Sequence, residues 1–264
     1  MLRRIRRSQI SFSFSVKFGD GVMYVGHFAA GLIIVAMAPK AKPLPILLGV
    51  GLLDIVNGLA VMTGVDHVTP NLASGPYLYF DLTFIDWDHS LLMATVLSIL
   101  WGALFFRDPR LALLAGVASF SHFLLDLPLH NSDLALYPHA ERHLGGGLWA
   151  SLGIGSWLLE GAFSAILVAV SWRLTARRGV SFAWPAAFLA ALFIQLSPWL
   201  SPTKFIATLP EPYTHLLLGL VISLGFIVPG AVLSILVATA ERRGQHDKVE
   251  PGIVVLAESK QSAP

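Results

Sequence analysis

Long apolar runs dominate this chain and limit what it can fold into. They cover residues 23–38, 44–64, 89–106, 111–129, 153–172, 181–200 and 215–240. A helix of about 20 apolar residues crosses the hydrocarbon core of a bilayer, which is roughly 30 Å thick. The composition agrees, because 55% of the residues are hydrophobic and only 13% are charged. We therefore predict an all-α fold, a polytopic transmembrane helix bundle of about seven spans whose main partner is the lipid bilayer.

The chain divides into three predicted segments. Residues 1–22 form a basic N-terminal extension that we interpret as absent from the native protein. A signal peptide has the same basic-then-apolar order, but His27 lies inside the apolar region here and Pro39 directly follows the candidate cleavage site. Residues 23–240 are the transmembrane helical domain. Residues 241–264 are charged and are predicted to be a disordered cytoplasmic tail.

Basic residues predict the orientation. Seven spans would place alternate loops on opposite sides, and the side that includes the C-terminal tail holds eleven Lys and Arg against two on the other. The positive-inside rule makes the first side cytoplasmic, which predicts a multi-pass protein of the inner (plasma) membrane with a cytoplasmic C-terminus. Since these residues lie in short loops beside apolar runs, we expect no nucleic-acid binding.

Histidine and aspartate inside or beside the apolar runs form the candidate site. Eight of the nine histidines fall on the non-cytoplasmic side of this topology. His122 and Asp126 are four residues apart and therefore share one face of a helix. Ionisable groups are costly in hydrocarbon, so a cluster of them indicates mutual pairing, a ligand or a functional site.

These residue types favour a metal ion. The chain has no cysteine, so an ion would be held by histidine and carboxylate, which suit Zn²⁺ best, with Mn²⁺ or Fe²⁺ as alternatives. The predicted ligands are His27, Asp54, His89, His122 and Asp126. A bound ion lowers the pKa of its water and creates a nucleophile. A carboxylate that is not a ligand can act as a general base, and Asp86, Asp88 and Glu160 are the predicted catalytic residues.

Other readings of the same residues remain open. Asp86 and Asp88 could cap the helix that begins near His89, and His122 and Asp126 could form a simple hydrogen-bonded pair. At the level of function, the alternative is a permease or proton-coupled transporter with a relay of buried histidine and aspartate. Such transporters often have two related halves with broken helices, and this sequence has no recognisable halves.

Several short motifs resemble one family, and they occur in its order. They are Met23 to His27, Leu52 to Asp54, Asp88 to Leu91, Ser121 to Asp126, His130 to Leu134, Gly147 to Trp149, and Glu160. Over about residues 23–170 the chain resembles the bacterial membrane-bound metal-dependent hydrolases of the YdjM-like type. The resemblance implies an integral membrane hydrolase of an unknown small-molecule or lipid-like substrate. It does not imply a second metal ion, because Val56 and Asn57 stand where that family has Asp and His.

Overall fold

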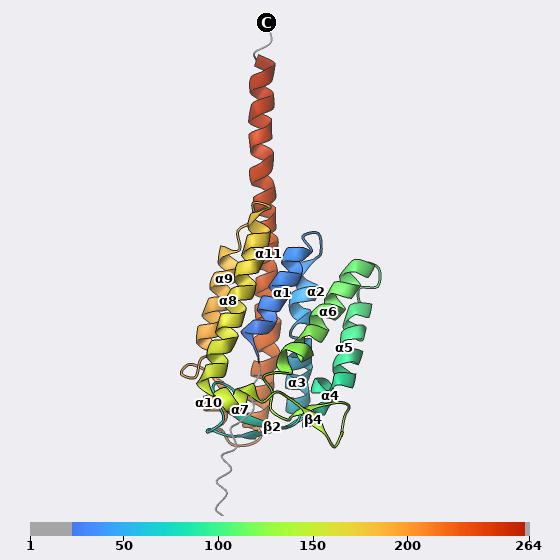
Figure 1. Ribbon diagram of the computed structural model, residues 1–264, viewed down its shortest axis with the longest axis vertical. Coiled ribbons are helices and arrows are strands. Elements are labelled where there is room, and N and C mark those ends of the chain that lie inside the picture. The colour runs from blue at the N-terminus through green and yellow to red at the C-terminus, as the bar shows by residue number, and fades with distance from the viewer. Residues whose placement is uncertain (1–22, 262–264) are drawn as a thin grey trace, which may run out of the picture.

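The computed structural model describes residues 23–261 and is mostly helical, with eleven helices and four short strands in that part of the chain (Figure 1). The elements are α1 (Val25–Met37), α2 (Pro43–Gly49), α3 (Leu52–Thr63), β1 (His67–Pro70), β2 (Phe80–Phe84), α4 (Asp86–His89), α5 (Leu91–Ala103), α6 (Pro109–Asp126), β3 (Leu134–Ala135), β4 (His143–Leu144), α7 (Leu148–Leu152), α8 (Ile154–Ala176), α9 (Ala183–Gln195), α10 (Thr203–Ile206) and α11 (Tyr213–Gln261).

The prediction of about seven membrane spans is wrong. Within the described residues, two helices are long and apolar enough to cross a membrane: α8 and the part Tyr213–Gly244 of α11. The bent pair α2 and α3 brings the number to three if it counts as one span. The helices α1, α5 and α9 have 13 residues each. At 1.5 Å per residue they extend about 20 Å, short of the roughly 30 Å of a bilayer core.

The apolar runs overstated the number of spans because breaks in the helices divide them. The run 44–64 bends by 52° between α2 and α3. The first residue of the run 89–106, His89, is the last residue of the separate short helix α4. Ser90 is extended and accepts a hydrogen bond from the backbone N–H of Met93 at the start of α5. The assignment of loops to two sides rested on seven spans, so it loses its basis.

The long helix α11 runs through the middle of the bundle and contacts α2, α3 and α9, while α8 packs against α1 and the α5–α6 hairpin lies at the outer edge (Figure 1). Helix α11 crosses α3 very closely, and glycines permit this. A Cβ atom added to Gly58 would lie 2.4 Å from the Gly219 carbonyl oxygen, and one added to Gly219 would lie 2.2 Å from the Gly58 oxygen. Small residues at such crossings let helix backbones approach, and this crossing fixes α3 and its Asp54 against α11.

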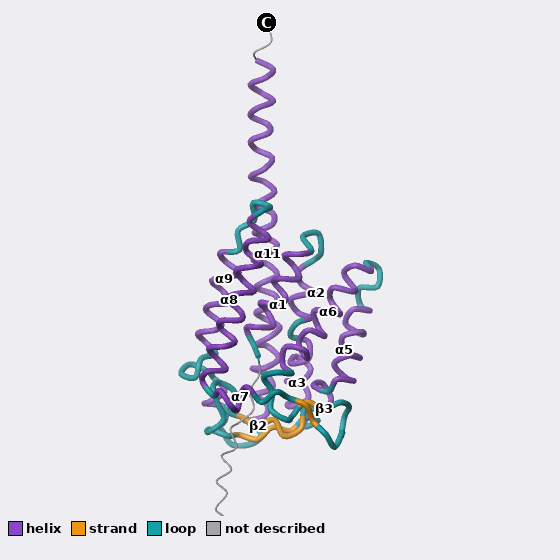
Figure 2. Tube along the Cα trace, in the orientation of Figure 1, coloured by secondary structure: helices purple, strands orange, loops and turns teal. Residues whose placement is uncertain are grey.

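One end of the bundle is covered by short elements and loops. The strands β1 and β2 pair antiparallel, β3 and β4 form a second antiparallel pair, and α4, α7 and α10 lie at the same end (Figure 2). The predicted extension 1–22 lies outside the described residues. The tail from Glu241, predicted to be disordered, continues α11 as helix to Gln261 and projects from the bundle (Figure 1).

Candidate metal centre

All five predicted metal ligands meet in one buried cluster. His27 comes from α1, Asp54 from α3, His89 from the end of α4, and His122 and Asp126 from the last turns of α6. A sixth residue, His130, follows one turn beyond Asp126. None of the six is more than 3% exposed.

Asp126 lies at the centre of this cluster. Its carboxylate oxygens are 3.0 Å from His122 Nε2 and 3.2 Å from His27 Nε2, and 3.8 Å from the Nε2 atoms of His89 and His130. Asp54 provides a second carboxylate, whose oxygens are 3.5 Å from the Nε2 atoms of His89 and His122. Four imidazole Nε2 atoms and two carboxylates therefore converge in one place.

The other ring nitrogen of three histidines is held by a partner outside the cluster. His122 Nδ1 lies 2.7 Å from the Val50 carbonyl oxygen, at the break between α2 and α3. His89 Nδ1 lies 2.5 Å from Asp88 Oδ1, and His130 Nδ1 lies 3.1 Å from Asp133 Oδ2. Such partners fix the ring orientation and the tautomer of metal-ligating histidines, so that Nε2 points at the ion.

The converging atoms do not satisfy one another as hydrogen bonds. Most of the buried side-chain nitrogen and oxygen atoms without a hydrogen bond, among the described residues, belong to these six residues, including both Asp126 oxygens and the Nε2 atoms of all four histidines. Their separations are short, but their geometry is not that of a hydrogen bond. Buried polar atoms left without partners are costly, and a cation bound among them would remove that cost.

Two overlapping sets of ligands have the spacing of a metal site. One is His27, Asp54 and His122, and the other is His89, His122 and Asp126; in each, the ligand atoms lie within 4.8 Å of one another. His122 belongs to both. Nitrogen and carboxylate oxygen are donors that suit Zn²⁺, so the cluster can hold a metal ion.

Comparisons with protein-family models, curated proteins and solved structures find no match. The resemblance to the YdjM-like hydrolases stays a prediction.

The three predicted catalytic carboxylates lie around the cluster. Asp88 orients His89 and also lies 3.4 Å from Asn57 Nδ2. Asp86 accepts the backbone N–H of His139 at 2.7 Å and lies 3.2 Å from His143 Nε2, so it fastens the loop before β4. Glu160 binds the first turn of α1.

Sequence reasoning missed His130 as a member of the cluster. The available signal was its spacing, because Asp126 and His130 are four residues apart, as are His122 and Asp126. The α6 helix ends at Asp126, but the His130 backbone N–H still bonds the Asp126 carbonyl at 2.9 Å, which keeps both side chains on one side. Asp133 lies three residues after His130, and this spacing lets its carboxylate hold His130 Nδ1 at 3.1 Å.

Asp66 and Asp88 form a pair of neighbouring carboxyl groups, and Asp88 contacts the His89 ring. Burial and the adjacent Asp88 raise the pKa of Asp66 to about 9. Burial also raises the pKa of Asp88, to about 7, while hydrogen bonds from Asp66 and Asn57 oppose that rise. At neutral pH Asp66 therefore carries a proton, which it can donate to Asp88.

We expect the substitution Asp66→Asn to make stability less dependent on pH. The folded-state pKa of Asp66, about 9, lies above its usual value of 3.8, so its contribution is complete below about pH 4 and is lost as the pH rises through 9. Asp66 alone should lower the free energy of unfolding by up to about 1.4 kcal/mol per pH unit over that range, and Asn removes that contribution. Thermal unfolding in detergent between pH 6 and 9.5 measures it. Equal slopes for the two proteins would contradict the shared proton.

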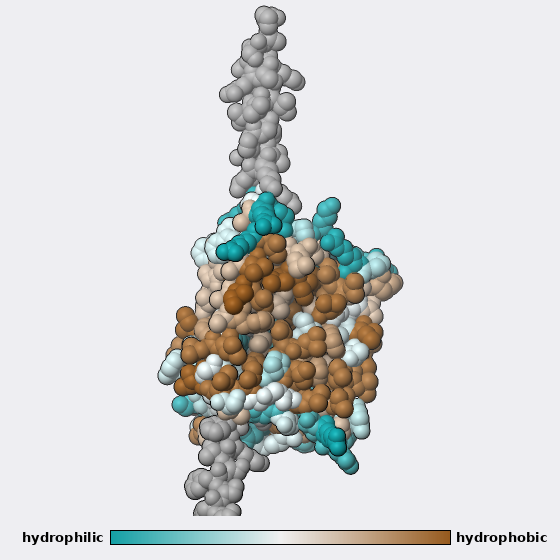
Figure 3. Space-filling model, viewed as in Figure 1, coloured by the Kyte–Doolittle hydropathy of each residue, from teal (hydrophilic) through white to brown (hydrophobic). Residues whose placement is uncertain are grey.

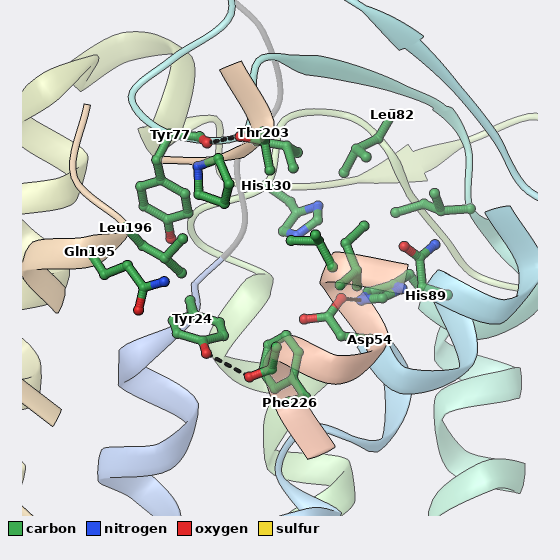
Figure 4. A pocket seen from close by; sticks show the side chains of 17 residues that line it. Tyr24, Asp54, Tyr77, Leu82, His89, His130, Gln195, Leu196, Thr203 and Phe226 are labelled. Atoms are coloured by element: carbon green, nitrogen blue, oxygen red, sulfur yellow. Dashed lines mark hydrogen bonds and ion pairs between the residues drawn. The ribbon is translucent and has the colours of Figure 1, made fainter. Parts of the chain in front are cut away.

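A cavity of about 130 Å³ reaches the cluster from the end covered by the strands (Figure 4). Asp54, His89 and His130 line it on one side, and His89 and Asp54 point toward each other there. Its other walls are largely apolar: Leu78, Leu82, Ile85, Leu196, Val221, Ile222 and Phe226. The cluster is therefore accessible from this cavity, whose other walls are largely apolar.

Proposed function

We propose that this chain is a membrane protein that binds a divalent metal ion, Zn²⁺ in the first instance, in its histidine and aspartate cluster and hydrolyses an ester of an amphiphilic molecule. The observation that carries the proposal is the convergence of four Nε2 atoms on two buried carboxylates, with three of the rings fixed through Nδ1. Catalytic metal sites combine such fixed ligands with one open position.

The ligand set His89, His122 and Asp126, to which His27 can add a further nitrogen beside Asp126, would leave Asp54 available for chemistry. When bound, a metal ion supplies a water whose pKa is lowered toward 7 and a Lewis acid for the substrate carbonyl or phosphoryl oxygen. Asp54 lies beside both His89 and His122 and also lines the cavity. This position suits a general base that takes a proton on the substrate side of the cluster.

The cavity supports an amphiphilic substrate. Its apolar walls would receive a hydrocarbon chain, while its cluster side would receive the polar ester group. Pockets with apolar walls and a few convergent polar groups orient their ligands in this way. We propose a carboxylic or phosphoric ester that carries an apolar chain.

The surface supports a location in a membrane. Hydrophobic residues cover the middle of the visible face, and hydrophilic residues gather at its two ends (Figure 3). Large side chains exposed on several helices, such as Leu113 on α6, Ile166 on α8 and Ile235 on α11, contribute apolar surface. Apolar belts of this kind suit contact with lipid. The inner membrane and a cytoplasmic C-terminus stay predictions, which a reporter enzyme fused to the C-terminus would test.

Hydrolysis can be measured directly on purified protein. Zn²⁺-loaded protein should hydrolyse either p-nitrophenyl palmitate or a phosphodiester with a long alkyl chain, and faster than its short-chain analogue. A metal chelator should abolish the activity, and added Zn²⁺ should restore it. Metal-loaded protein that cleaves none of these esters, or cleaves them equally after chelation, would contradict the proposal.

A bulky residue in the cavity should block substrate without removing the metal. We expect Ile222→Trp, on the cavity wall, to lower kcat/KM for a long-chain ester at least about 10-fold while metal content stays at the wild-type level. The control is Ile227→Trp on the same helix, because Ile227 is 38% exposed and does not line the cavity. Equal loss of activity in both variants would count against the cavity as the substrate site.

A further inference from the structure

Glu160 is a buried carboxylate on α8 that binds the start of another helix. It is 1% exposed. Its Oε1 accepts the backbone N–H groups of Tyr24, Val25 and Gly26 at 2.7, 2.6 and 3.2 Å. Its Oε2 accepts the Tyr77 hydroxyl at 2.8 Å. One carboxylate thus joins α8, the first turn of α1 and the wall of the cavity.

This carboxylate does for α1 what a capping side chain usually does. The first N–H groups of a helix have no partner within it, and they carry the positive end of the helix dipole. Tyr24, at the N-cap position of α1, makes no side-chain cap hydrogen bond, and its hydroxyl donates to the Gly225 carbonyl. Glu160 supplies both the acceptor and the negative charge from a distant part of the sequence.

The capped turn leads directly to the metal centre. His27 follows Gly26, the last of the three residues whose N–H groups Glu160 accepts. Its Nε2 lies 3.2 Å from Asp126, and its ring stacks on His122 with centroids 3.8 Å apart. Neither ring nitrogen of His27 has a hydrogen bond to a described residue, unlike the rings held through Nδ1 by Val50, Asp88 and Asp133. The position of the His27 ring therefore depends on the position of the α1 backbone.

We propose that Glu160 is a positioning residue that holds His27 in the metal centre through the first turn of α1. This inference rests on the metal site proposed above. It gives His27 the support that its own ring lacks, and it links the ligand to Tyr77, which lines the cavity. If Glu160 only held α8 against α1, its loss would lower the stability of the protein, and any change in metal affinity would not depend on His27.

A double-mutant cycle on metal affinity separates these roles. Zn²⁺ affinity is measured by chelator competition for wild type, Glu160→Ala, His27→Ala and the double variant. We expect Glu160→Ala to weaken Zn²⁺ binding about 10- to 100-fold, the usual effect of losing the support of a ligand. In the His27→Ala background the same change should alter affinity less than twofold. That background should still bind Zn²⁺, with lower affinity, because His89, His122 and Asp126 remain as ligands.

The Gln variant guards against a protein that fails to fold. Glu160→Gln keeps an oxygen that can accept the three N–H groups and loses the charge, so we expect a weakening of several-fold in wild type and none in His27→Ala. Equal losses in both backgrounds, or no loss in the wild-type background, would overturn the positioning role alone. Wild-type protein that binds no metal would overturn the proposed function and this inference with it.

Discussion

The substitution His122→Ala is expected to abolish stoichiometric metal binding. His122 belongs to both candidate ligand sets, its Nε2 lies 3.0 Å from Asp126, and its ring is fixed by the Val50 carbonyl. Alanine therefore removes the one ligand that no alternative set replaces. Elemental analysis of detergent-purified protein should fall from about one Zn²⁺ per chain to less than about 0.1, and hydrolysis should fall with it.

His67→Ala is the matched control for this experiment. His67 lies in β1, is exposed, and is outside both ligand sets. Its loss should leave the metal content and the thermal midpoint near the wild-type values. Full metal content in His122→Ala, or equal losses in both variants, would show that the cluster is not the binding site.

Removal of the metal is expected to destabilise the protein strongly. Without an ion, the buried oxygens of Asp126 and the four Nε2 atoms have no hydrogen-bond partner among residues 23–261. A ligand present at about 1,000 times its Kd stabilises the folded state by about 4 kcal/mol. For a domain of this size that corresponds to a fall in thermal midpoint on the order of 10 °C after chelation.

The same treatment of His122→Ala provides the control. That variant has no site to empty, so a chelator should leave its midpoint within about 1 °C. A wild-type midpoint that does not respond to chelation, in protein shown to carry metal beforehand, would contradict the stabilising role of the ion.

The helical class could be read from the sequence, but the number of spans could not. Apolar runs report composition, whereas a span also needs an unbroken helix of sufficient length. Breaks occur where another interaction replaces the helical one. The Val50 carbonyl bonds His122, which is 72 positions away, so no periodicity in the run shows this break. At Ser90 the break is local, because its side chain caps the start of α5 by accepting the Met93 N–H.

That five of the six residues lie close together, all but His130, was predictable for a related reason. Ionisable groups inside apolar runs have to find one another, and the i, i+4 pair of His122 and Asp126 gave the centre of the cluster. The roles of the outer carboxylates were not predictable. Glu160 acts on the backbone of residues 24–26, more than 130 positions away in the chain, and only the packing of α8 on α1 brings them together.

The metal content and coordination of wild-type protein test the central claim most directly. Detergent-purified protein, loaded with Zn²⁺ and freed of excess, should contain about one ion per chain. Its X-ray absorption spectrum should show only nitrogen and oxygen ligands near 2.0–2.1 Å, with the outer-shell scattering of at least two imidazole rings. Folded protein that retains no Zn²⁺, Mn²⁺ or Fe²⁺ after loading would contradict the account, and the same cluster would then have to be tested as a proton relay in a transport assay.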